Sequence, residues 1–199
     1  MKTVFRALTL LLLLAPSVAL AHSGPAGHTH GFVQGFLHPL GGLDHVLAMV
    51  AVGLLAAHLG GRALVLVPAS FVSLMALGGT LGFAGIVLPY TELAIALSVI
   101  VLGALVAFRA NLSLALASTI AGGFAIFHGY AHGAELPAGA SSLFYAVGFL
   151  LATALLHLAG IALGLGFAKL SAGHLGERIV QASGGAMTLA GVVLLARAF

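Results

Sequence analysis

The feature that most constrains this chain is a series of long apolar stretches that hold almost no charged residue. Six of them alternate with short breaks rich in turn-forming or charged residues, and they cover residues 32–58, 63–87, 91–109, 112–132, 141–168 and 178–197. An α-helix needs roughly 20 consecutive apolar residues to cross a bilayer. The stretches therefore predict an all-α integral membrane protein, a polytopic bundle of about six transmembrane helices.

The composition supports this class and excludes others. Hydrophobic residues make up 61% of the chain and charged residues 6%, which leaves too little polar surface for a soluble domain. Because there is no cysteine, we expect no disulfide framework, thiolate metal site or iron–sulfur centre. Part of the net charge of +3 comes from Lys2 and Arg6 at the N-terminus, and nucleic-acid binding is not expected.

The first 21 residues have the three parts of a secretory signal peptide. A basic start is followed by an apolar run over residues 7–15 and by the small-x-small site Ala19-Leu20-Ala21. We therefore divide the chain into a cleaved signal peptide (1–21), a His/Gly-rich periplasmic segment (22–31) and a six-helix transmembrane domain (32–199). The alternative is an uncleaved anchor, although the apolar run is shorter than a bilayer span.

The basic residues of the breaks predict the orientation. The breaks on one side of the predicted bundle hold four of them: Arg62, Arg109, Lys169 and Arg178. The breaks on the other side, around Pro89 and Pro137, hold neither Lys nor Arg, and Arg197 is the single exception. By the positive-inside rule, we expect a bacterial inner-membrane protein whose mature N-terminus and C-terminus are both periplasmic.

Ionisable residues gather in a first motif, His38-Pro39-Leu40-Gly41-Gly42-Leu43-Asp44-His45. A charged side chain at the bilayer centre costs about 2.5 to 3.5 kcal/mol on insertion scales, so such residues usually mark an ion or substrate path. On an unbroken helix His38 and His45 would share a face. Pro39 and the glycines instead predict a helix that breaks and begins again near Leu43. Asp44 then lies in the first turn of this new helix. A carboxylate is favoured at a helix N-terminus, so a purely structural role for Asp44 is the alternative to metal binding.

A second motif, His128-Gly129-Tyr130-Ala131-His132-Gly133-Ala134-Glu135, closes another apolar stretch. His128 and His132 are spaced to bind one ion from one helical face, and Glu135 continues that face if the helix persists. The zinc-protease motif His-Glu-x-x-His needs a glutamate where this chain has Gly129. Because that general base is missing, we do not expect an enzyme.

The two motifs together supply four histidines and two carboxylates, a ligand set for a divalent transition metal held between the first and fourth predicted helices. Zinc and copper remain open on this chemistry. No phosphate-binding loop is present, so transport would not be driven by ATP. His157 and His58 are possible exit ligands or packing residues. The N-terminal segment could collect metal through His22, His28 and His30, or it could be solvated and disordered.

The strings HPLGGLDHVLAMVAVGLLA and HGYAHGAELP resemble the HupE/UreJ family of nickel and cobalt permeases, and the resemblance extends over the mature chain. It implies a permease for Ni²⁺ or Co²⁺ without a permanent cofactor, which serves hydrogenase or urease maturation or cobalt uptake. A cytoplasmic nickel-delivery protein and a homo-oligomer are possible partners. The implied metal-binding residues are His38, Asp44, His45, His128, His132 and Glu135.

Two other classes remain as alternatives. In a membrane haem protein, histidines on facing helices would be axial ligands, but Asp44 and Glu135 suit a hydrated cation better than a buried haem. A membrane-bound metallohydrolase would use the same ligands with a metal-activated water, and would need a cleft that such short loops are ill-suited to build.

Overall fold

The computed structural model of the chain describes residues 29–136, 141–170 and 174–197. These residues form seven α-helices and no strand: α2 (Thr29–Gly41), α3 (Leu43–Leu59), α4 (Ala63–Phe83), α5 (Thr91–Ala107), α6 (Leu114–Ala134), α7 (Ser142–Leu170) and α8 (Leu175–Arg197). The prediction of an all-α protein is confirmed for this part of the chain. The expected signal peptide, residues 1–21, lies outside the described residues.

Four helices, α4, α6, α7 and α8, are long and apolar enough to cross a membrane. The α2–α3 pair, taken from Gly31 to Leu59, passes the same test together but is bent by 82°. The remaining helix, α5, has 17 residues and is a shorter apolar helix. These features indicate a multi-pass membrane protein with four or five long spans, and the third predicted span, 91–109, corresponds to the shorter helix α5.

The outward faces of the long helices are apolar, as a lipid environment requires. Between 17% and 33% of the most apolar 18-residue window of each long helix is buried inside the bundle. On α7, for example, Leu143, Val147, Leu151 and Leu158 are all exposed. Contiguous apolar surface of this extent is rare on soluble monomers and typical of contact with lipid or another protein.

The chain breaks at Gly42, as the first motif predicts. Gly42 is extended, with φ −97° and ψ 117°, and α3 begins at Leu43. The Asp44 carboxylate turns back over the break and accepts a hydrogen bond from the His45 backbone N–H at 2.7 Å. A side chain at residue 42 would crowd this carboxylate, since an added Cβ would lie 2.8 Å from Asp44 Oδ1.

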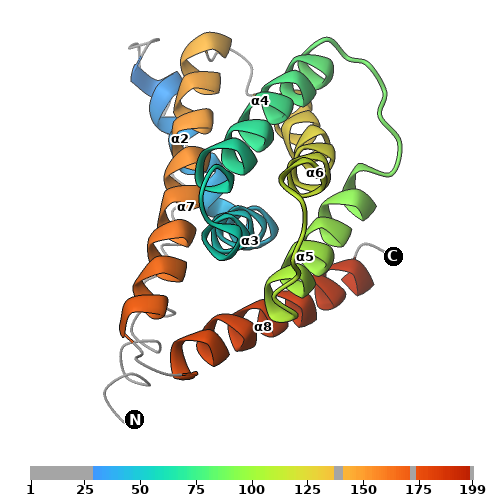
Figure 1. Ribbon diagram of the computed structural model, residues 1–199. Helices are drawn as coiled ribbons and strands as arrows, with labels where there is room; N and C mark the ends of the chain where they lie inside the picture. The colour runs from blue at the N-terminus through green and yellow to red at the C-terminus, as the bar shows by residue number, and fades with distance from the viewer. Residues whose placement is uncertain (1–28, 137–140, 171–173, 198–199) are drawn as a thin grey trace.

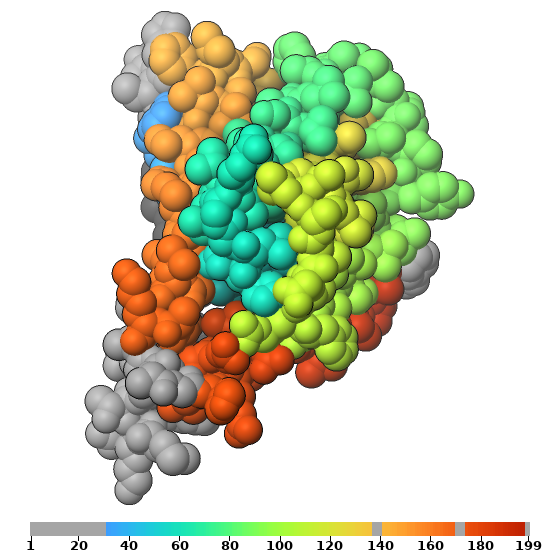
Figure 2. Space-filling view, in the orientation of Figure 1, coloured from blue at the N-terminus to red at the C-terminus, as the bar shows by residue number. Residues whose placement is uncertain are grey.

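Helix α3 lies in the middle of the bundle, and Figure 1 views it nearly along its axis with α7, α4, α5 and α8 around it. Its buried residues form much of the core, together with the inward faces of α4, α5 and α6. In the space-filling view, the first half of α4 (teal) lies between α7 (orange) and the α5–α6 connection (yellow-green) (Figure 2).

The helices associate in four glycine-lined pairs. In the α4–α6 pair, a Cβ added at Gly129 would overlap the Met75 carbonyl oxygen, and one at Gly133 would overlap that of Gly79. Similar backbone approaches join α7 to α2 and α3, and α8 to α5, at Gly35, Gly148, Gly53, Gly160, Gly103 and Gly184. Small residues let helices approach closely in lipid, where packing replaces the hydrophobic effect as the driving force.

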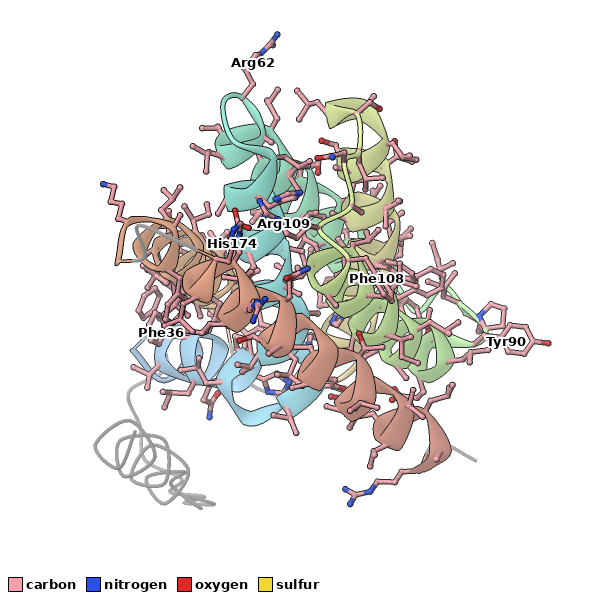
Figure 3. The ribbon with its side chains drawn as sticks, turned by 60° about the horizontal axis from the view of Figure 1, so that its bottom comes forward. Phe36, Arg62, Tyr90, Phe108, Arg109 and His174 are labelled. Atoms are coloured by element: carbon pink, nitrogen blue, oxygen red, sulfur yellow. The ribbon has the colours of Figure 1, made fainter. Side chains whose placement is uncertain are left out.

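The predicted cytoplasmic connections meet at one end of the bundle, which we call the basic end. Here Arg109, at the end of α5, forms an ion pair with Glu177 of α8. His58, in the last turn of α3, places Nε2 3.0 Å from the Arg109 carbonyl oxygen. Arg62 projects away from the helices, and Tyr90 projects from another edge of the molecule (Figure 3).

Candidate metal site

The outer part of the site combines His38, His132 and Glu135. One possible ligand atom from each of these side chains lies within 4.8 Å of the others. His38 Nε2 is 3.9 Å from Glu135 Oε2, and the His38 and His132 rings are 4.6 Å apart, edge to face. Glu135 is exposed and His38 is half-buried, so this group is open to an ion from outside.

The inner part of the site is a buried contact among three imidazoles. His45 Nδ1 lies 3.0 Å from His132 Nε2 and 3.1 Å from His128 Nδ1. His45 and His128 are fully buried, and His132 takes part in both the outer and inner groups. We call these four histidines, His38, His45, His128 and His132, together with Glu135, the histidine cluster.

The separation of these nitrogens suits metal binding. Two imidazole nitrogens that bind one zinc-like ion at 2.0–2.1 Å are about 2.9 to 3.4 Å apart at octahedral or tetrahedral angles. The two contacts at His45 Nδ1 fall in this interval. Without an ion, each contact needs one nitrogen to donate its proton and the other to accept it.

Two further nitrogens of the cluster have no partner in the residues that the structure describes. His45 Nε2 and His132 Nδ1 are both buried and make no hydrogen bond there. Buried polar side-chain atoms in folded proteins nearly always have a partner, and each exception calls for an explanation. A bound cation together with its water ligands would satisfy such nitrogens.

An access route reaches the cluster from the end opposite the basic end. A cavity of about 300 Å³ lies between α4, α6 and α7, and its walls include His132, Met75 and Tyr145. Leu136 and Ser142, beyond the end of α6 and at the start of α7, also line it. The cavity therefore leads from the ends of these helices to His132.

The structure thus brings together five of the six residues that the two motifs single out. Asp44 differs, because its carboxylate is bonded to the backbone of its own helix turn. Glu135 joins the cluster even though α6 ends at Ala134, so the helical face predicted for it does not persist. Whether these residues bind metal stays a prediction.

The remaining candidate histidines lie apart from the cluster. His157 is buried in α7 beyond Phe71, and His58 lies at the basic end. His22 and His28 lie outside the described residues, and His30 belongs to the first turn of α2. A shared site for the N-terminal histidines therefore stays a prediction.

Three residues at the cluster are absent from the motifs. Ser98 of α5 places Oγ 2.8 Å from His128 Nε2, on the side away from His45. Phe149 packs its ring 4.7 Å from His132 and 5.3 Å from His45, and Tyr145 lies 5.8 Å from His38. The one signal in the sequence that could have pointed to these residues is the polar side chain of Ser98 inside an apolar stretch.

Comparison with known proteins bears on the identity of this site. A family model described as HupE / UreJ protein matches residues 10–194. The chain belongs to the HupE/UreJ family. It is 48% identical over 187 residues to Protein HupE of Rhizobium leguminosarum bv. viciae, which covers 94% of this chain and 95% of that protein. No solved structure matches the chain.

The HupE/UreJ match includes both histidine motifs, so the resemblance inferred from them is confirmed. The family is associated with nickel and cobalt uptake for hydrogenase and urease. In this HupE/UreJ protein the histidine cluster places imidazole nitrogens and a carboxylate, donor types that suit such ions, within an otherwise apolar bundle.

Ser98 is expected to position His128, and removing its hydroxyl should weaken metal uptake. Groups that orient metal-binding imidazoles typically contribute about 10- to 100-fold to affinity. We expect Ser98→Ala to raise the KM for nickel uptake about tenfold and to change the maximal rate much less. The matched control is Ser183→Ala, whose exposed hydroxyl bonds only to the Ile179 carbonyl in α8. An unchanged KM for Ser98→Ala would contradict this role.

Proposed function

We propose that this chain is a secondary transporter, a permease that moves a divalent transition metal ion from the periplasm to the cytoplasm. Ni²⁺ or Co²⁺ is the substrate, and hydrogenase or urease maturation is the use. The single observation that carries the proposal is the close approach of His45, His128 and His132 inside an apolar bundle. Membership of the HupE/UreJ family supports it.

The donor atoms of the cluster explain the choice of ion. Imidazole nitrogen with a single carboxylate suits borderline ions such as Ni²⁺, Co²⁺ and Zn²⁺, whereas Mg²⁺ and Ca²⁺ prefer all-oxygen sites. Glu135 and His38 are the accessible members and would capture the ion first. His132 contacts both groups and would pass the ion on to His45 and His128.

The basic end supports a cytoplasmic exit. The Arg109–Glu177 ion pair lies over a smaller cavity of about 180 Å³, which is also lined by His58. The ion would leave here after the pair separates, to a cytoplasmic nickel-delivery protein.

The proposal is tested by the uptake of radioactive nickel and of radioactive cobalt into cells that express the intact chain. We expect uptake above that of cells without the protein, and we expect unlabelled Ni²⁺ or Co²⁺ to compete more strongly than Mg²⁺. Uptake of neither ion, with the protein present in the membrane, would overturn the proposal. Stronger competition by Zn²⁺ than by either ion would identify Zn²⁺ as the substrate and leave the proposal of transport unchanged.

The proposed orientation predicts the behaviour of reporter fusions. Alkaline phosphatase, which is active only in the periplasm, should be active when fused after Arg197 and inactive when fused after Arg109. The reason is the concentration of basic residues on the Arg109 side, which the positive-inside rule assigns to the cytoplasm. Fluorescent-protein fusions at the same two positions should give the reverse pattern. Phosphatase activity in the fusion after Arg109, but not in the fusion after Arg197, would show the opposite orientation.

A further inference from the structure

His157 differs from the other buried histidines, His45 and His128, in that neither of its ring nitrogens has a partner in the described residues. It lies in the middle of α7 and is 1% exposed, and both Nδ1 and Nε2 are buried without a hydrogen bond. His58 and His128, in contrast, each place a ring nitrogen against a protein oxygen. Leaving a buried polar group unpaired is unfavourable, so this position calls for a ligand that the described residues do not supply.

One aromatic side chain packs against both His157 and the histidine cluster. The Phe71 ring of α4 is 5.1 Å from the His157 ring and 5.9 Å from the His128 ring, measured between centroids. Phe71 is fully buried and has no hydrogen-bonding atom in its side chain. It therefore contacts both sites without satisfying the nitrogens of either.

Other donor atoms lie one helical turn from this contact. Thr153 precedes His157 by one turn of α7, and Met75 follows Phe71 by one turn of α4. The Thr153 hydroxyl lies 3.8 Å from the Met75 sulfur, and both residues are buried. A thioether with an imidazole and a hydroxyl would favour a transition metal over Mg²⁺ or Ca²⁺.

The position of His157 fills a gap in the route. Between His45 and His58, α3 has no nitrogen- or oxygen-bearing side chain, a distance of about 20 Å at 1.5 Å per residue. His157 lies beside this part of α3, because the Gly53 backbone packs on its carbonyl group. Two turns further along α7, Gly164 lines the cavity that contains His58.

We propose that His157 is a second binding station for the transported divalent ion, between the histidine cluster and the basic end. It takes the ion from His128 when the Phe71 ring moves aside, with Met75 and Thr153 as neighbouring donors. It then releases the ion toward the cavity at His58. The inference rests on the proposed transport function and adds to it an internal step.

The first test is uptake of radioactive nickel by His157→Leu and His157→Gln, matched with the intact chain for membrane abundance. We expect both variants to lose at least about tenfold in initial rate, because neither side chain offers an imidazole ligand. The control is His174→Leu, which removes an exposed histidine and should transport normally. If the role of His157 is packing or hydrogen bonding alone, Gln should restore uptake, which would overturn the inference.

The second test measures binding directly, in purified protein that carries His45→Ala and His132→Ala. Visible absorption of added Co²⁺ should report one remaining bound ion, and the further change His157→Gln should remove it. Absence of a His157-dependent cobalt signal, with normal uptake by both His157 variants, would overturn the second station and leave the proposed function intact. Failure of the intact chain to bind or transport either metal would instead refute the proposed function.

Discussion

Replacement of His132 by alanine should abolish nickel and cobalt uptake, with a loss of at least about a hundredfold. His132 is the one imidazole that contacts both the exposed group around Glu135 and the buried pair His45 and His128. Its loss removes a ligand from both parts of the cluster, whereas loss of a group that only orients a ligand costs about 10- to 100-fold. The measurement is the initial rate of uptake in cells with equal amounts of each variant in the membrane.

His174→Ala is the matched control for this experiment. His174 is an exposed histidine beside the start of α8, at the basic end, and it should be replaceable without loss of uptake. Purified His132→Ala should also bind fewer Co²⁺ ions than the intact protein, which links the loss of uptake to the site. Normal uptake by His132→Ala would show that the ion does not pass through the histidine cluster.

Substitution of Gly129 by alanine is expected to have the largest effect on stability. An added Cβ at this position would overlap the Met75 carbonyl oxygen and would lie 2.9 Å from the Gly79 amide nitrogen. Both are backbone atoms of α4, so the clash is relieved only if the helices separate. Overpacking typically costs about 1 to 3 kcal/mol, and we expect Gly129→Ala to lie at the upper end of that interval. Thermal or denaturant unfolding in detergent measures the loss.

The matched control is Gly123→Ala, in the same helix. Gly123 is exposed, and a Cβ added there would meet no atom within 4 Å. Because alanine is a better helix former than glycine by roughly 0.5 to 1 kcal/mol, this variant should be slightly more stable than the intact chain. Equal effects of the two substitutions would show that close approach of α4 is not the reason for glycine at residue 129.

The sequence was sufficient for features that depend on local chemistry. Apolar stretches predicted the helices, and the Pro39, Gly41 and Gly42 group predicted a helix that begins again at Leu43. The two motifs were predicted to meet between the first and fourth predicted helices, which agrees with the contact between His45 and His132. These inferences use only spacing, turn chemistry and hydropathy, which are properties of short segments.

Features that depend on packing between distant segments were beyond such reasoning. The bend of 82° between α2 and α3 determines which groups face α6, and nothing in the motif specifies its size. Asp44 bonds to the backbone of its own turn, although its residue type alone favoured a place among the ligands. Ser98 reaches His128 from a helix 30 residues away in sequence, so the contact depends on how α5 and α6 are aligned.

The glycine-lined pairs have a mechanical consequence for the site that they enclose. His38 and His45 lie on α2 and α3, which are held backbone to backbone against α7, while His128 and His132 lie on the tightly joined α4–α6 unit. The proposed ligands of the ion are therefore divided between two stiff bodies, with the cluster at the seam. A small rocking motion of one body against the other would break several contacts between the ion and its ligands at the same time. Release would then follow from the motion itself, without unwinding any helix.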